Sequence, residues 1–142
     1  MRFVHFVGVL LLMGVALAVP ARADTGGSIH GGGTASDMTR FALAVQGGTG
    51  HFECLMPAMM TVEATVTGID TISTTDASFH GTAAVTLAAN NPFGLPAGPM
   101  ARNQPFTASV TAGGPGTGFV DLTIMGMDFA GTVEHGQISV GA

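Results

Sequence analysis

The sequence predicts an all-β fold, a small antiparallel β-sandwich or partly closed β-barrel of about eight to nine short strands. Apolar and polar residues alternate at the period of a β-strand along most of the chain. Glycine-rich turns separate these alternating segments. No segment keeps apolar residues at spacings of three and four, so we expect helices to be minor or absent.

The first half of the chain holds four predicted strands, at residues 28–30, 39–46, 51–56 and 60–67. Within the second of these, Phe41, Leu43 and Val45 share one face, as the buried side of a strand does. The glycine turn that follows makes the second and third strands a β-hairpin. Glycines also predict turns at residues 31–33 and 68–70.

The second half continues the pattern, with predicted strands at residues 77–80, 82–88, 106–110 and 119–127, and a closing hairpin of 131–133 with 137–140. The turn of that hairpin is expected at Glu134-His135-Gly136. Residues 90–105 contain Pro92, Pro96, Pro99 and Pro105 and form the longest irregular stretch. Loops of this kind often carry function.

The amino terminus predicts a secretory signal peptide at residues 1–23, followed by a single β-domain at residues 24–142. A positive start precedes the apolar run 3–19, Pro20 ends that run, and Ala21-Arg22-Ala23 offers small residues for cleavage. A membrane anchor is the alternative, because the run is nearly long enough to span a bilayer. The cleavage site favours removal, so we expect a secreted or periplasmic protein, cleaved near Ala23, without a permanent membrane anchor.

Charge excludes some partners. Beyond residue 23 the chain keeps two arginines, Arg40 and Arg102, against nine Asp and Glu, a net charge of −7, and it has no lysine. Nucleic-acid binding depends on Lys and Arg that neutralise phosphates, so we expect no nucleic-acid partner. Anionic membrane surfaces are disfavoured for the same reason. A protein or a surface polymer is the partner that this composition allows.

Sulfur-containing residues form one candidate metal site, a Cu(I) site, because soft thiolate and thioether ligands select Cu(I). Its candidate ligands are Cys54, Met56, Met59, Met60, Met125 and Met127. The last two are expected on one face of a strand. The alternative is that methionines fill an irregular core and that Cys54 is a small buried residue. As the single cysteine, Cys54 cannot form an internal disulfide.

Catalytic motifs are weak. The segment His30-Gly31-Gly32-Gly33 is similar to an oxyanion-hole turn, but no Gly-x-Ser-x-Gly sequence accompanies it. Two carboxylate pairs, Asp121 with Asp128 and Glu53 with Glu63, could act as general acid and base in a small secreted hydrolase. Acids scattered over a chain are more often solvated surface positions. We therefore expect that the protein is not an enzyme.

A family resemblance rests on short motifs spread over residues 24–142. They are Phe41-x-Leu43-x-Val45, Gly50-x-Phe52-x-Cys54, Ala77-x-Phe79-x-Gly81, Pro105-Phe106-x-Ala108-x-Val110, Gly114-Pro115-Gly116-Thr117-Gly118 and Gly131-Thr132-Val133-x-x-Gly136-Gln137-Ile138, after a glycine-rich start. In these the chain resembles an uncharacterised family of exported bacterial β-domains, labelled post-COAP, often a C-terminal module of secreted or surface proteins. Cys54 stands where that family tends to carry an aromatic residue.

The resemblance implies an accessory domain without a catalytic motif, and it supplies no ligand. Together with the residue patterns, it predicts an exported non-catalytic β-domain that acts as a binding or structural module at or outside the cell envelope. The alternatives are a periplasmic or secreted Cu(I)-binding protein and a small secreted hydrolase.

Overall fold

The computed structural model describes residues 26–36, 38–100 and 102–142, so the predicted signal peptide lies outside the described residues. The described chain folds into nine strands and contains no helix, and so no helix that could cross a membrane. The strands are β1 (Ser28–Ala35), β2 (Met38–Gln46), β3 (Thr49–Met56), β4 (Met60–Ile72), β5 (Asp76–Leu87), β6 (Gly98–Pro99), β7 (Gln104–Thr111), β8 (Phe119–Ile124) and β9 (Met127–Gly141). The predicted all-β fold class is confirmed.

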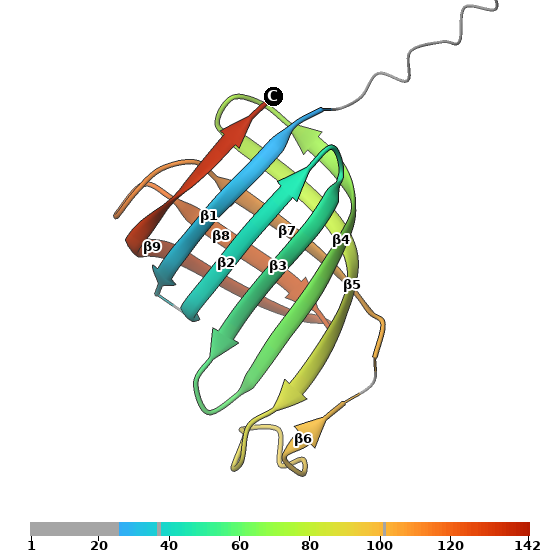
Figure 1. Cartoon of the computed structure of the whole chain (residues 1–142). Helices are drawn as coiled ribbons and strands as arrows, with labels where there is room; N and C mark the ends of the chain where they lie inside the picture. Colours follow the sequence, from blue (N-terminus) through green and yellow to red (C-terminus); the bar gives the residue numbers. More distant parts are fainter. Residues whose placement is uncertain (1–25, 37, 101) are drawn as a thin grey trace, which may run out of the picture.

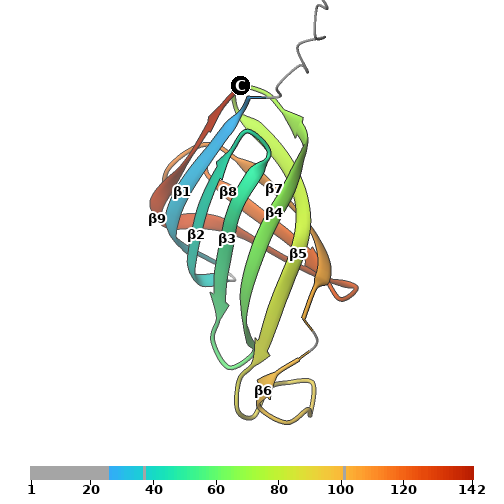
Figure 2. The ribbon, with the colours of Figure 1, turned by 45° about the vertical axis from the view of Figure 1, so that its right-hand side comes forward.

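Eight of these strands close into an antiparallel β-barrel (Figure 1). Each strand pairs with the next along the chain, except that β7 replaces the two-residue β6, which pairs only with the end of β5. The second part of β9 returns to pair with β1 along the whole of β1, from Ser28 opposite Gly141 to Ala35 opposite Val133. The turned view of Figure 2 shows this closure beside the sheet of β1–β5. The barrel, rather than the sandwich, is therefore the architecture.

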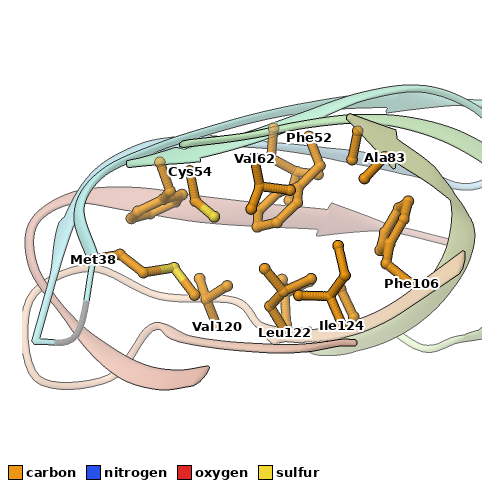
Figure 3. Close-up of a cluster of buried hydrophobic side chains, with 14 of the residues drawn as sticks. Met38, Phe52, Cys54, Val62, Ala83, Phe106, Val120, Leu122 and Ile124 are labelled. Atoms are coloured by element: carbon orange, nitrogen blue, oxygen red, sulfur yellow. The ribbon is translucent and has the colours of Figure 1, made fainter. Parts of the chain in front are cut away.

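The barrel interior is filled by apolar side chains, because every second residue of each strand points inward (Figure 3). Its centre is a cluster of three phenylalanines, Phe52, Phe79 and Phe106, whose ring centroids lie 6.0 to 6.4 Å apart. Such separations suit edge-to-face and offset aromatic contacts. An eight-stranded barrel is just wide enough for side chains to fill it. Here they do, and the interior is a packed core.

The closing hairpin predicted at residues 131–140 is wrong. Residues Met127–Gly141 form one continuous strand, which pairs with β8 up to Thr132 and with β1 from Val133 onward. Glu134 is an extra residue at the change of partner, where the register shifts and the strand bulges. The segment Glu134-His135-Gly136, predicted as a turn, is therefore a bulge within one strand. Sequence periodicity does not distinguish such a bulge from the turn of a hairpin.

The strand predicted at residues 119–127 is also wrong in its last residues. Strand β8 ends at Ile124, and Met125 and Gly126 form a two-residue turn, with φ of 53° and 73°. Positive φ at both central residues is the geometry of a tight hairpin turn. Met125 and Met127 consequently lie in a turn and at the start of β9, and they do not share one face of a strand.

Other boundaries differ because strands run through predicted turns. Strand β1 continues through its glycines to Ala35, and β4 continues past residues 68–70 to Ile72. The two strands predicted between residues 77 and 88 are the single strand β5. In β1 and β5 the glycines are paired to both neighbouring strands, and residues 68–72 of β4 are paired to β5 alone; in each case strand pairing outweighs the local preference of glycine for turns.

The first part of the proline-rich stretch 90–105 is held by one side chain. The Asn91 side chain is buried, donates to the carbonyls of Ala88 and Leu95, and accepts from the backbone N–H groups of Phe93 and Leu95. This one amide therefore fixes residues 88–95, in the manner of an Asx turn.

The close fit at Gly81 yields a test of the core. A Cβ atom at Gly81 would clash with the Thr65 carbonyl oxygen and would lie 3.0 Å from the Phe106 ring. We expect Gly81→Ala to lower the free energy of unfolding by about 1–3 kcal/mol, as overpacking does. The measurement is urea unfolding followed by circular dichroism. Gly32→Ala is the matched control, because its nearest atom would be 3.4 Å away; equal losses in both variants would contradict the packing argument.

Candidate functional site

The methionines of the described chain lie in or beside strand connections, and Met125 and Met127 stand apart from the others, because the β8–β9 turn is the length of β8 away from the Thr132–Ser36 contact. Because consecutive strands are antiparallel, the β1–β2, β3–β4 and β5–β7 connections all lie at the same end. The five methionines in or beside them are Met38, Met56, Met59, Met60 and Met100. We call this the methionine end; Ser28 and Gly141 lie at the opposite end.

An open cleft of ≈ 780 Å³ lies at the methionine end. Its apolar lining residues are Ala35, Met38, Met56, Pro57, Met59 and Phe129. Its polar lining residues are Thr34, Ser36, Glu134 and His135. Met38 and Met56 are at most 1% exposed and continuous with the barrel core, so they form a closed floor. The cleft therefore combines a thioether and aromatic surface with a polar rim.

Backbone hydrogen bonds hold both walls of the cleft. The Ser36 backbone N–H donates to the Thr132 carbonyl over 3.1 Å, and the Ser36 hydroxyl accepts from the Thr132 N–H over 3.0 Å. On the other wall, Met59 donates to the Met56 carbonyl and accepts from the N–H of Ala88. The cleft is thus bounded by fixed turns.

The polar rim is shaped by the irregular pairing of β1 and β9. Gly33 and Gly136 pair at φ of 144° and 92°, and a Cβ atom on either would overlap the backbone of the opposite strand. Close approach at this point is followed by the bulge that adds Glu134. Bulges of this kind re-aim side chains and are frequent next to functional sites.

The Thr34 hydroxyl at this rim is buried and has no hydrogen-bond partner in the described chain. Leaving such a group unpaired costs about 1–3 kcal/mol. A native structure that keeps an unpaired polar group calls for an explanation, and a bound molecule is one.

The structure places the six sequence-predicted copper ligands differently from one another. Cys54, Met56 and Met60 point into the barrel core and are at most 2% exposed. Met59 lines the cleft beside Met56. Met125 lines a separate hollow of ≈ 210 Å³, and Met127 is half-buried against the core. The predicted Cu(I) site stays a prediction, but its six residues do not meet at one solvent-reachable point.

Cys54 is the least available of these ligands. Burial raises the pKa of its thiol to about 12. The thiolate is the form that binds metals and reacts, so a thiol held neutral is inert. The described structure shows Cys54 as a free buried cysteine, which agrees with its interpretation as a small core residue.

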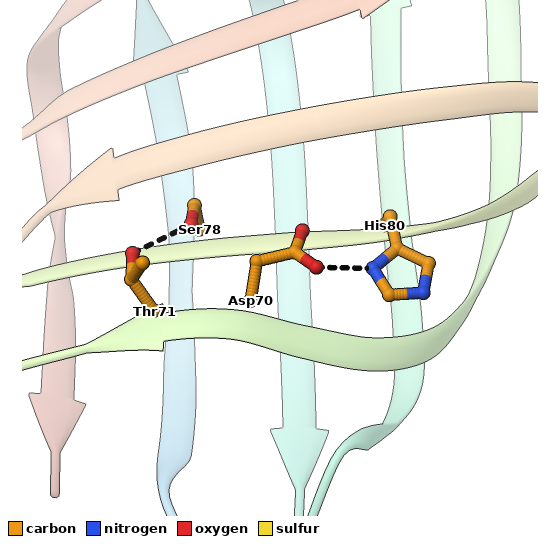
Figure 4. A network of polar contacts seen from close by, with 4 residues as sticks. All are labelled: Asp70, Thr71, Ser78 and His80. Carbon is orange, nitrogen blue, oxygen red and sulfur yellow. Dashed lines mark hydrogen bonds and ion pairs between the residues drawn. The ribbon is translucent and has the colours of Figure 1, made fainter.

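An Asp–His pair lies on the outer wall away from the cleft (Figure 4). His80 Nδ1 and Asp70 Oδ1 are 2.7 Å apart, and both side chains are about half exposed. Such a pair orients an imidazole in a catalytic triad. Here the nearby Ser78 hydroxyl bonds to Thr71 over 2.6 Å, and the other His80 nitrogen points away from Ser78. The pair therefore does not form a nucleophile–base arrangement with Ser78.

The two predicted carboxylate pairs also lie on the outer wall. Glu53 and Glu63 lie on adjacent strands, β3 and β4, as predicted, and the structure places them directly opposite each other. Burial, and then the neighbouring Asp128 carboxylate, raise the pKa of Asp121, whereas the Thr123 hydroxyl lowers the pKa of Asp128. Asp121 lines a hollow of only ≈ 150 Å³, below the size of typical ligand pockets. Within the described residues, no three His, Cys, Asp or Glu side chains are placed to hold a metal ion.

Comparison with protein families, with curated proteins and with solved structures finds no match to this chain. The resemblance to exported post-COAP domains stays a prediction.

Sequence reasoning missed the residues of the polar rim. Thr34, Glu134 and His135 belong to segments that were expected to be turns or their flanks, and Phe129 lies between two predicted strands. The glycines at residues 31–33 and 136 could have indicated that these two segments pair, because glycines that face each other allow two strands to approach closely.

The buried thiol predicts an alkaline instability. Its pKa rises from 9.0 to about 12 on folding, so above pH 9 the unfolded chain loses a proton that the folded chain keeps. Stability should therefore fall by about 1.4 kcal/mol per pH unit between pH 9 and 12. The chain has no Lys or Tyr to titrate in this range. Urea unfolding under reducing conditions at pH 9 and 11 measures the slope.

Cys54→Ala is the control variant for this measurement. It should show a much flatter dependence over the same pH range, whatever its absolute stability. Equal slopes in the variant and the unaltered protein would refute the assignment to Cys54.

Proposed function

We propose that this chain is an exported, non-catalytic binding domain that takes up a small, mainly apolar molecule in the cleft at the methionine end. The observation that carries the proposal is the cleft itself, whose volume of ≈ 780 Å³ lies in the range of small-molecule sites. The mouths of β-barrels are a preferred place for such sites. Export is inferred from the predicted signal peptide.

The methionine side chains support this proposal. Methionine is unbranched and polarisable, and it adapts to ligands of different shape. Met38, Met56 and Met59 line the cleft together with Phe129, whereas Phe52, Phe79 and Phe106 pack on one another inside the core. The adaptable methionines thus surround the opening, and the three packed phenylalanines hold the barrel behind it.

A second candidate function is Cu(I) binding in the same cleft. The three methionines that line this cleft favour it, because thioethers select Cu(I) and imidazole is a common partner ligand. Met59 and His135 both line the cleft. Met38 and Met56 would have to move from the core to complete the coordination.

Ligand uptake is tested with the neutral fluorescent probe N-phenyl-1-naphthylamine. The chain has no Trp or Tyr, so the probe signal is free of protein background. We expect probe fluorescence to rise on binding. Phe129→Ser should raise the dissociation constant of the probe roughly tenfold, because burying a phenylalanine side chain contributes about 1.5–3 kcal/mol. Phe129 lines the cleft and packs on the core.

Phe119→Ser is the matched control, since Phe119 is exposed at the start of β8 and is not one of the residues that line the cleft. Thermal unfolding establishes that both variants are folded. If Phe129→Ser is unfolded, Met59→Asp takes its place. Equal probe affinity in the cleft variant and in Phe119→Ser would rule out this cleft as the binding site.

Copper binding is tested by competition with a Cu(I)-selective chelator. We expect Met59→Leu to reduce the affinity at least tenfold if the cleft holds the ion, and Cys54→Ala to leave it unchanged because that thiol is buried and neutral. Met125→Leu is the control, since Met125 lines another hollow. Absence of Cu(I) binding, or equal loss in the Met125 variant, would eliminate this candidate.

A further inference from the structure

We propose that the molecule bound in the cleft carries a positively charged amino group on an apolar body. This inference rests on the proposed function, because it names the ligand class for the same cleft. The apolar body would lie against Met59 and Phe129, and the amino group at the polar rim beside Glu134 and Thr34.

Charge is the first argument for an amine. Glu134 is an exposed carboxylate at the rim, and within the described residues it makes no ion pair. None of the ten lining residues is Lys or Arg. An anionic ligand would meet this carboxylate without compensation, in a chain whose residues 24–142 carry a net charge of −7. A cation is attracted both by the Glu134 carboxylate and by the net negative charge of the chain.

Hydrogen bonding is the second argument. Thr34 lines the cleft, and its buried hydroxyl oxygen is unpartnered in the described chain, so it would accept a hydrogen bond from a bound donor once the rim shifts to expose it. An ammonium group brings three donors and no acceptor. An ammonium group therefore has enough donors for both Thr34 and Glu134. An alcohol has one donor, which can serve only one of the two, and a carboxylate ligand has none.

Backbone geometry is the third argument. Thr34 pairs with His135 across β1 and β9, and the register shift immediately after it inserts Glu134. In a regular strand, successive residues of β9 would alternate between the two faces of the sheet. At the bulge this alternation is interrupted, and Glu134 and His135 are both exposed. The bulge instead puts Thr34, Glu134 and His135 together on one cleft wall.

The experiment compares three ligands with the same eight-carbon body, octylamine, octanol and octanoate, in displacing N-phenyl-1-naphthylamine at pH 7.5. We expect octylamine to displace the probe at roughly two- to fivefold lower concentration than octanol, as a solvent-exposed ion pair provides, and octanoate to be the weakest. The advantage of octylamine should shrink in 0.5 M salt, about the concentration at which exposed charges are largely screened.

Variants assign the effect to the rim. Glu134→Gln should abolish the advantage of octylamine and leave octanol unchanged. Glu63→Gln is the matched control, because Glu63 is an exposed carboxylate on β4 that does not line the cleft. Thr34→Val should reduce the advantage without lowering the melting temperature, since it removes an unpaired buried hydroxyl.

The outcomes separate the two proposals. Octanol as effective as octylamine, or an advantage that survives Glu134→Gln, would overturn the amine inference and leave the apolar cleft standing. If neither the probe nor any of the three ligands binds, the proposed function fails, and the amine inference fails with it.

Discussion

The pairing of the first strand with the last is the constraint on which the rest of this structure depends. Strands β1 and β9 close the barrel, and without their pairing both would present free edges. The closure needs an unusually close approach, which the facing glycines Gly33 and Gly136 permit. The strain of changing partners from β8 to β1 is absorbed by the bulge at Glu134. The same seam that closes the barrel therefore forms one wall of its cleft.

Alternation along single strands made much of the fold predictable from the sequence. Phe41, Leu43 and Val45 are buried on one face of β2, as their spacing indicates, and Glu53 and Glu63 lie on adjacent strands, as predicted. Local glycine content misled wherever a strand was paired on both sides. Gly31 lies within β1, and glycine is required there because a side chain would collide with the Gln137 carbonyl of the adjoining strand β9. Such a requirement depends on a residue a hundred positions away, so no local pattern contains it.

The candidate site was less predictable than the fold for the same reason. Its apolar half was visible as a cluster of methionines, but local sequence does not separate those on the cleft wall, such as Met59, from those sealed in the core, such as Met60. The polar half is assembled from β1 and β9, which meet only in the folded barrel. Packing also decides the chemistry: Cys54 has the most reactive side chain of the sulfur cluster, and burial makes it the least reactive.

The barrel's two ends differ in a way that matters for attachment. Ser28 and Gly141 are neighbours across the β1–β9 pair, so polypeptide leading into β1 and polypeptide leaving β9 both emerge at the end opposite the cleft. A domain or surface tethered on either side would leave the cleft facing outward and unobstructed. Because the paired ends lie about 5 Å apart, a short linker could join them and new termini could be opened in another loop. A circular permutant opened at the β3–β4 turn would reverse this polarity and bring the tether to the methionine end.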